Sequence, residues 1–193
     1  MTANKPQIIL ASASPRREHL LREMGLRFVV VQPNGVEELV EGAAPDVVAM
    51  RNAQRKARAV AGRHPESMVI GADTIVVLDG KIFGKPRDHK DALQMLGQLA
   101  GHRHEVITGV CLVHRSLDTE LTFADTTRVW MRPLLPAQII EYHARMDPLD
   151  KAGAYAIQEH GEGIVERIEG SYNNVMGLPT ERLQATLERL GML

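Results

Sequence analysis

Near its N-terminus the chain carries a strand–turn–helix pattern that narrows the folds open to it. The apolar run IILA at residues 8–11 is followed by the polar segment SASPRR at 12–17, and then by apolar residues at helical spacing up to Gly25. Ser14 is of a type that caps helices, and Pro15 suits the first helical position because no N–H partner is needed there. The pattern predicts a short strand, a tight turn and a helix that begins at Pro15.

Two arginines occupy the first turn of this predicted helix. Arg16 and Arg17 face the positive end of the helix dipole, which is unfavourable until an anion neutralises it. The hydroxyls of Ser12 and Ser14 and the free N–H groups of the first turn converge on the same place. The segment therefore predicts a site for phosphate. The alternative is that both arginines are solvated charges on an ordinary helix.

The composition is that of an ordinary globular protein. With 193 residues, 44% of them hydrophobic and 24% charged, the chain is expected to form a single domain over residues 1–193. A net charge of −1 and an aromatic content of 4% argue against nucleic acid as a partner. No apolar stretch is long enough for a membrane span and no leader-like run opens the sequence, so a cytoplasmic protein without a membrane partner is expected. The single cysteine, Cys111, is expected to be buried and inert.

A carboxylate interrupts one of the most apolar strands. The run MVIGADTIVVL at 68–78 is turned by Asp79 and Gly80 into residues 81–83, which predicts a β-hairpin with positive φ in its turn. Asp73 lies inside this run. Burying a carboxylate is costly unless it is paired or binds a cation. Asp73 is therefore either structural, with a hidden partner, or functional.

The remaining pattern mixes helices and strands. Helices are predicted at 46–61, 89–99, 136–145 and 179–190, and strands at 28–31, 105–113 and 121–131, the first of these buried. The apolar positions of the first helix are Val47, Met50, Ala53, Ala57 and Val60, and its charges form a solvated face from which a single lysine could point into a cleft. In the third helix, Ile139, Ile140 and Tyr142 are expected to pack inward.

Several charged residues would suit hydrolysis of a phosphoanhydride. That chemistry needs cations against phosphate oxygens, carboxylates for a divalent metal and a group that activates water. The available cations are Arg16, Arg17, Lys56 and Lys85, and the available oxygen ligands for Mg²⁺ or Mn²⁺ are Glu38 and Asp73. No GxxxxGK[ST] motif is present, so a P-loop enzyme has no support. Spacing alone does not bring these side chains together.

Four motifs resemble, in order, those of the Maf family of nucleoside triphosphate pyrophosphatases: LASASPRR at 10–17, GADT at 71–74, GKP at 84–86, and GSY leading to GLP over 170–179. The resemblance spans nearly the whole chain. It implies metal-dependent hydrolysis of a nucleoside triphosphate between the α and β phosphates, giving the monophosphate and pyrophosphate. It also implies an α/β fold in which a mixed, strongly bent sheet with flanking helices separates two lobes around a central cleft, as in inosine triphosphate pyrophosphatase.

The segment DKAGAYAIQ at 150–158 is similar to the branch of the family that acts on dTTP and UTP. Position by position, the resemblance makes Asp73 the proton acceptor and Arg16, Thr74 and Gln158 specificity residues. The other polar residues that it places in the cleft are Ser12, Ser14, Arg17, Glu38, Lys56 and Lys85. Glu38 and Asp73 would hold the metal, Lys56 and Lys85 would offset developing charge, and the Gln158 amide suits the imide edge of thymine or uracil.

Other possibilities stay open at this point. One is the family branch that acts on 7-methyl-GTP. Another, of a different class, is a nucleotide-responsive binding protein that regulates cell division or septum formation, which would bind nucleotides without turnover. The resemblance is compatible with a homodimer. Whether Asp73 acts as base, as metal ligand or as both is also open.

Overall fold

The computed structural model describes residues 6–36 and 43–193, so the predicted metal ligand Glu38 lies outside the described residues. The strands are β1 (Ile8–Ala11), β2 (Phe28–Val30), β3 (Met68–Leu78), β4 (Lys81–Phe83), β5 (Arg103–His114), β6 (Thr119–Met131) and β7 (Val165–Glu169). The helices are α1 (Pro15–Glu23), α2 (Pro45–Ala61), α3 (His89–Leu99), α4 (Pro136–His143), α5 (Tyr172–Met176) and α6 (Thr180–Arg189), with short 3₁₀ helices η1 (Ala152–Ala154) and η2 (Gly161–Gly163).

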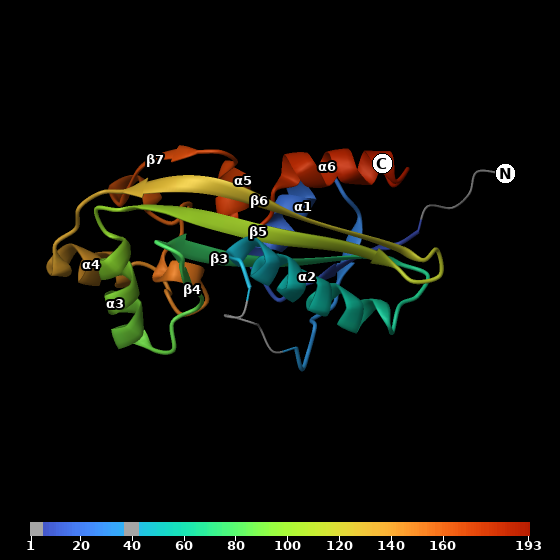
Figure 1. Ribbon diagram of the computed structural model, residues 1–193, viewed down its shortest axis with the longest axis horizontal. Helices are drawn as coiled ribbons and strands as arrows, with labels where there is room; N and C mark the ends of the chain where they lie inside the picture. Colours follow the sequence, from blue (N-terminus) through green and yellow to red (C-terminus); the bar gives the residue numbers. More distant parts are fainter. Residues whose placement is uncertain (1–5, 37–42) are drawn as a thin grey trace.

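One mixed sheet of seven strands organises the molecule. Its strand order is β2–β1–β3–β5–β6–β7, and β4 pairs with β3. β1 is parallel to β2 and β3, whereas the other pairings are antiparallel. The long β5–β6 hairpin follows the long axis of the molecule (Figure 1). The mixed α/β architecture expected from the sequence is therefore confirmed.

The sheet is covered on both faces because its central strands are apolar on both. Successive strand residues point to opposite faces. On β1, Ile8 and Leu10 join the core that includes residues of α1 and α6, whereas Ile9 and Ala11 pack against α2. In Figure 1, α2 lies across the sheet from α1 and α6. A further core, built on α3 and α4, covers the other end of the sheet.

Several local expectations need correction. The predicted strand at 28–31 is not buried: β2 is an edge strand, and its Val29 and Val30 are exposed. Ile140 of α4 is exposed, while Ile139 of the same helix is buried. β7 and α5 lie in the glycine-rich region for which no strand or helix was predicted.

Cys111 is buried beneath α2, as expected. Burial raises the pKa of its thiol to about 11, which keeps the thiol protonated and unreactive at neutral pH. No helix within residues 6–36 and 43–193 has both the length and the apolar character of a membrane span.

Candidate active site

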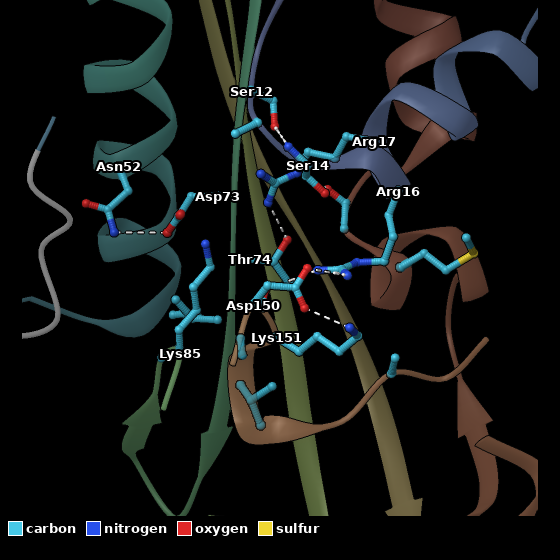
Figure 2. A pocket seen from close by; sticks show the side chains of 18 of the residues that line it. Ser12, Ser14, Arg16, Arg17, Asn52, Asp73, Thr74, Lys85, Asp150 and Lys151 are labelled. Carbon is cyan, nitrogen blue, oxygen red and sulfur yellow. Dashed lines mark hydrogen bonds and ion pairs between the residues drawn. The ribbon is translucent and has the colours of Figure 1, made fainter. Parts of the chain in front are cut away.

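A cavity opens where β3 lacks a neighbouring strand along one edge. The pairing of β1 with β3 ends at Ala11 and Gly71, and the pairing of β4 with β3 begins at Val76 and Phe83. Residues 72–75 lie in the gap between these two pairings. The loop that follows β1 and the loop that follows β4 border this gap, and between them lies a cavity of about 440 Å³ (Figure 2).

Every predicted site residue that the structure describes lines this cavity: Ser12, Ser14, Arg16, Arg17, Lys56, Asp73, Thr74, Lys85 and Gln158. They come from the loop after β1, the start of α1, α2, β3, the loop after β4 and the segment at 150–158. The cavity separates two cores on one face of β3, because Ala72 belongs to the α1–α6 core and Val76 to the α3–α4 core. This arrangement agrees with the expected cleft between two lobes.

Asp73 is buried and held at both carboxylate oxygens. The Lys56 ammonium lies 2.6 Å from Oδ1, and the Asn52 amide donates a hydrogen bond of 2.9 Å to Oδ2. Asp73 is 4% exposed, yet it lines the cavity. The hidden partner that a buried carboxylate needs is therefore present, and the functional role of Asp73 stays a prediction.

Two glycines allow α2 to bring Lys56 and Asn52 this close to the sheet. A Cβ at Gly71 of β3 would lie 2.5 Å from the carbonyl oxygen of Ala53, and one at Gly109 of β5 would lie 2.4 Å from that of Ala49. These are distances that atoms cannot adopt without movement of the backbone. The missing side chains thus set the depth at which α2 packs.

The hydrogen bonds in the turn before α1 differ from the predicted helix cap. Ser14 occupies the N-cap position, but its side chain accepts no hydrogen bond from the helix. Instead, its backbone N–H donates to the Ser12 hydroxyl over 3.0 Å. The predicted capping role of the Ser14 side chain is therefore wrong. The helix does not use the Ser14 hydroxyl. Ser14 lines the cavity at the start of α1, where the first-turn N–H groups have no partner within the helix.

Arg16 is fixed to the segment that carries Gln158. Its guanidinium donates to the Asp150 carboxylate over 3.1 Å and to the Asp150 carbonyl over 3.3 Å. Lys151 lies 2.7 Å from the other oxygen of this carboxylate (Figure 2). Burial disfavours the ionised form of Asp150, but the hydrogen bond from Lys151 and the charge of Arg16 outweigh it and lower the pKa of Asp150 below its usual value.

Arg17 is fixed to a different part of the C-terminal region. It donates to the Gly177 carbonyl over 2.8 Å and to the Thr74 hydroxyl over 2.9 Å. Thr74 and Thr108 hydroxyl oxygens are 3.0 Å apart, and Thr108 donates to the Asn174 carbonyl. A hydroxyl has one proton to give, so Thr74 donates to Thr108 and must accept from Arg17. These hydrogen bonds therefore all run in one direction, from Arg17 at the cavity through Thr74 and Thr108 to Asn174 in the core.

The wall beside Gln158 is held by a buried tyrosine. The Tyr142 hydroxyl accepts from the Ala156 N–H over 3.0 Å and donates to the Ala156 carbonyl over 3.1 Å. Burial raises the pKa of Tyr142 to about 12, so its donor proton stays in place. Gln158 donates weakly to Glu159 over 3.3 Å, and its side-chain carbonyl oxygen is buried without a hydrogen-bond partner among the described residues. This unused acceptor belongs to a residue that lines the cavity.

Lys85 extends from the loop after β4 toward the Asp73 side of the cavity (Figure 2). The loop is attached to the opposite wall, since the Gly153 N–H donates to the Gly84 carbonyl over 3.1 Å. The described part of the cavity lining carries more positive than negative charge, because Arg16, Arg17, Lys56, Lys85 and Lys151 face Asp73 and Asp150. An anionic ligand suits this balance.

Comparison with known proteins agrees with this geometry. The family model described as Maf-like protein matches residues 7–190. The chain belongs to the Maf family. It is 47% identical to a dTTP/UTP pyrophosphatase of Symbiobacterium thermophilum, over 96% of this chain and 94% of that protein. It is 48% identical to a protein of the same name from Geobacter sulfurreducens, over 98% and 99% of the two chains.

The fold of this Maf protein is also similar to that of solved structures with much lower sequence identity. The Ham1 protein of Staphylococcus aureus matches with a TM-score of 0.54 at 16% identity, over 95% of this chain and 99% of that one. A HAM1 protein of Coxiella burnetii matches with a TM-score of 0.51 at 14% identity, over the same shares. These matches concern the fold alone.

Sequence reasoning assigned no site role to several polar residues of the Maf cavity, among them Asn52, Asp150 and Lys151. Asp150 and Lys151 had served only as part of a branch-specific pattern, without individual roles. Asn52 precedes Lys56 by four residues, so both lie on one face of α2. This spacing was the available signal, since a lysine expected to point into a cleft takes its neighbour one turn earlier with it.

Proposed function

We propose that this protein hydrolyses dTTP and UTP between the α and β phosphates, releasing the nucleoside monophosphate and pyrophosphate. The observation that carries the proposal is the meeting of Asp73 with the cations Arg16, Arg17, Lys56 and Lys85 around one cavity. The names of the relatives, at identities of 43–48% over nearly the full chain, support the choice of substrate. Gln158 supports it chemically, because its unpartnered amide oxygen can accept from the imide N–H of thymine or uracil.

A divalent cation fits the donor set. Each Asp73 oxygen accepts from one of Lys56 and Asn52, and a carboxylate oxygen has a further lone pair to offer. Mg²⁺ in enzymes of this chemistry is held by one or two carboxylates, with phosphate and water oxygens completing its shell. Asp73 would hold the ion, together with Glu38 according to the family resemblance. When bound, Mg²⁺ or Mn²⁺ would neutralise phosphate charge and lower the pKa of a coordinated water.

The roles of the chain's own residues follow from their positions. Arg16, Arg17 and the first-turn N–H groups of α1 bind phosphate oxygens, and Lys85 approaches them from the other side. A water molecule attacks phosphorus in the α–β anhydride, the bridging bond breaks and pyrophosphate leaves. Asp73 accepts the proton of that water. Lys56 balances the charge of Asp73 and reduces the cost of keeping this carboxylate ionised in a buried position.

A substrate panel tests the reaction. The purified protein is incubated with dTTP, UTP, CTP, GTP and 7-methyl-GTP in Mg²⁺ or Mn²⁺, and products are separated by chromatography. Monophosphate and pyrophosphate from dTTP and UTP are expected. Cleavage of 7-methyl-GTP alone would overturn the substrate class. Tight nucleotide binding without turnover would contradict the enzyme and favour the regulatory binding protein.

The role of Asp73 is tested by Asp73→Asn. We expect kcat for dTTP to fall by about 100- to 10,000-fold, the range typical of a lost general base. The matched control is Asp118→Asn, because Asp118 lies in the exposed β5–β6 turn with a φ of 47°, a conformation that asparagine tolerates. The control should keep wild-type kcat. Near-normal turnover by the Asp73 variant would exclude this carboxylate as the base.

A further inference from the structure

Asn52 is a buried polar side chain on the inner face of α2, which is apolar apart from Asn52 and Lys56. It is 1% exposed, and its helical neighbours Val48, Ala49 and Ala53 are buried with it. An amide in such surroundings is costly unless it is hydrogen-bonded. Asn52 lines the cavity and gives its Nδ2 hydrogen to Asp73 Oδ2 over 2.9 Å (Figure 2). Its placement therefore serves the carboxylate, and the packing of α2 alone does not require it.

The carboxylate of Asp73 needs two contacts to hold its orientation. The last torsion of an aspartate side chain is broad, so a single donor leaves the plane of the carboxylate free to turn. Lys56 contacts Oδ1 and Asn52 contacts Oδ2, from positions one helical turn apart on α2. With both contacts in place, the plane is fixed relative to the cavity.

The two donors differ in charge, which makes the two oxygens unequal. Lys56 places a cation against Oδ1, whereas Asn52 offers Oδ2 a neutral amide. The oxygen beside the cation is the weaker proton acceptor, because protonation there would place a second positive charge next to the ammonium group. Oδ2 is accordingly the better acceptor of a proton from water.

We propose that Asn52 is a positioning residue that orients Asp73 so that Oδ2 accepts the proton of the attacking water. This inference rests on the proposed pyrophosphatase function and deepens it. In this assignment Asn52 acts through Asp73 and is given no contact with phosphate. Its loss therefore changes the rate of the chemical step and leaves substrate affinity nearly unchanged.

The first test replaces Asn52 by Leu, which has the same branched outline and no donor. We expect kcat for dTTP to fall by about 10- to 100-fold, the loss that corresponds to one hydrogen bond to a charged group. KM should change by less than about threefold, since uniform binding of substrate is not affected. Asn52→Gln keeps an amide and borders open cavity space, and it should recover a substantial part of kcat.

The control separates orientation from stability. Val60 is buried on the same helix and lies outside the cavity lining, so Val60→Ala loosens α2 without touching Asp73. This variant should lose thermal stability and keep kcat at a temperature where it is folded. If Asn52→Leu does not fold, Asn52→Ser, whose hydroxyl is too short to replace the amide contact, provides the same comparison.

The outcomes distinguish this inference from the proposed function. A wild-type protein that fails to hydrolyse dTTP contradicts the function itself. With an active wild type, the inference is overturned if Asn52→Leu keeps kcat within twofold, if KM rises while kcat is unchanged, or if Asn52→Gln is as impaired as Asn52→Leu. A selective loss of kcat that Gln restores supports it.

Discussion

At the scale of single residues, Lys151 is a buried cation held by a carboxylate at the edge of the cavity. Its side chain is buried, and it contacts Asp150 Oδ1 over 2.7 Å and the Asp147 carbonyl over 2.7 Å. Asp150→Asn removes the nearer counter-ion and leaves the buried ammonium group with Glu159, whose Oε1 lies 3.5 Å away. We expect the free energy of unfolding to fall by about 1–2 kcal/mol, less than for a fully buried pair because Asp150 is partly exposed.

Urea unfolding of the wild type, of Asp150→Asn and of a double variant measures this effect. In the double variant with Lys151→Met, the buried charge is gone, so its stability should lie above that of Asp150→Asn alone. Comparison of Asp150→Asn with the double variant thus reports whether the loss of stability comes from the buried charge of Lys151. If the double variant is the less stable of the two, the loss comes from packing or from the contact with Arg16, and the explanation fails.

The same scale shows which side chains a sequence can reveal. Asp73 could be singled out because a carboxylate in an apolar strand is unusual whichever face of the sheet it lies on. Asn52 is harder to single out, because its four-residue spacing from Lys56 becomes informative only once the rotation of α2 about its axis is known. Val47 and Met50, predicted as inward positions, are only half-buried, and the inner face is turned toward Val48 and Asn52. That rotation is set by contacts with distant strands, which local periodicity does not contain.

At the scale of elements, the close packing of α2 on β3 and β5 is the feature that positions the site. A methyl group at Gly109 would lie 2.4 Å from the backbone of Ala49. Gly109→Ala must therefore push α2 outward, and we expect a loss of about 3 kcal/mol in stability, at the upper end of overpacking effects. The displaced helix carries Lys56 and Asn52 with it, so kcat for dTTP should fall in the folded protein as well.

Gly163→Ala provides the matched control, because a methyl group there meets nothing within 4 Å and its φ is not positive. Denaturant unfolding and dTTP hydrolysis, measured at a temperature where each variant is folded, should leave this control close to wild type. An unchanged stability for Gly109→Ala would mean that α2 can shift without cost, which contradicts the account given for its depth.

Elements with strong local signals were predictable and elements that depend on partners were not. The β3–β4 hairpin follows from Asp79 and Gly80, whose φ angles of 49° and 78° are those that its turn requires. β7 exists because it pairs with the edge of β6, across an irregularity at Trp130 and Met131. The polar, glycine-rich sequence around β7 contains no alternation strong enough to show this pairing.

At the scale of the whole molecule, the two arginines of the α1 turn connect regions far apart in sequence. Arg16 contacts Asp150 and Arg17 contacts Gly177, so the turn proposed to bind phosphate is attached to two separate points in the C-terminal third of the chain. The family motifs were read from the sequence in the right order. Their convergence on one cavity is a property of the sheet, because it needs the gap that β1 and β4 leave along β3.

The pH dependence of global stability depends on a histidine behind this cavity. His104 of β5 is 1% exposed, and its Nε2 lies 2.8 Å from the hydroxyl of Tyr155, which lines the cavity. Burial lowers the pKa of His104 from 6.5 to about 4. Between these values the unfolded chain binds a proton that the native protein does not, so the histidine's contribution to stability is lost as pH falls from 6.5 toward 4.

At pH 5 the free energy of unfolding is lower by about 2 kcal/mol than at neutral pH because of this histidine. We expect His104→Gln, which cannot titrate, to show a shallower decline in stability between pH 7 and pH 5 than the wild type, whatever its stability at pH 7. Urea unfolding at a series of pH values measures both slopes. The control is His102→Gln, two residues away and exposed, which should decline in parallel with the wild type. Parallel curves for His104→Gln and the wild type would show that His104 is protonated equally in both states and that its burial carries no penalty.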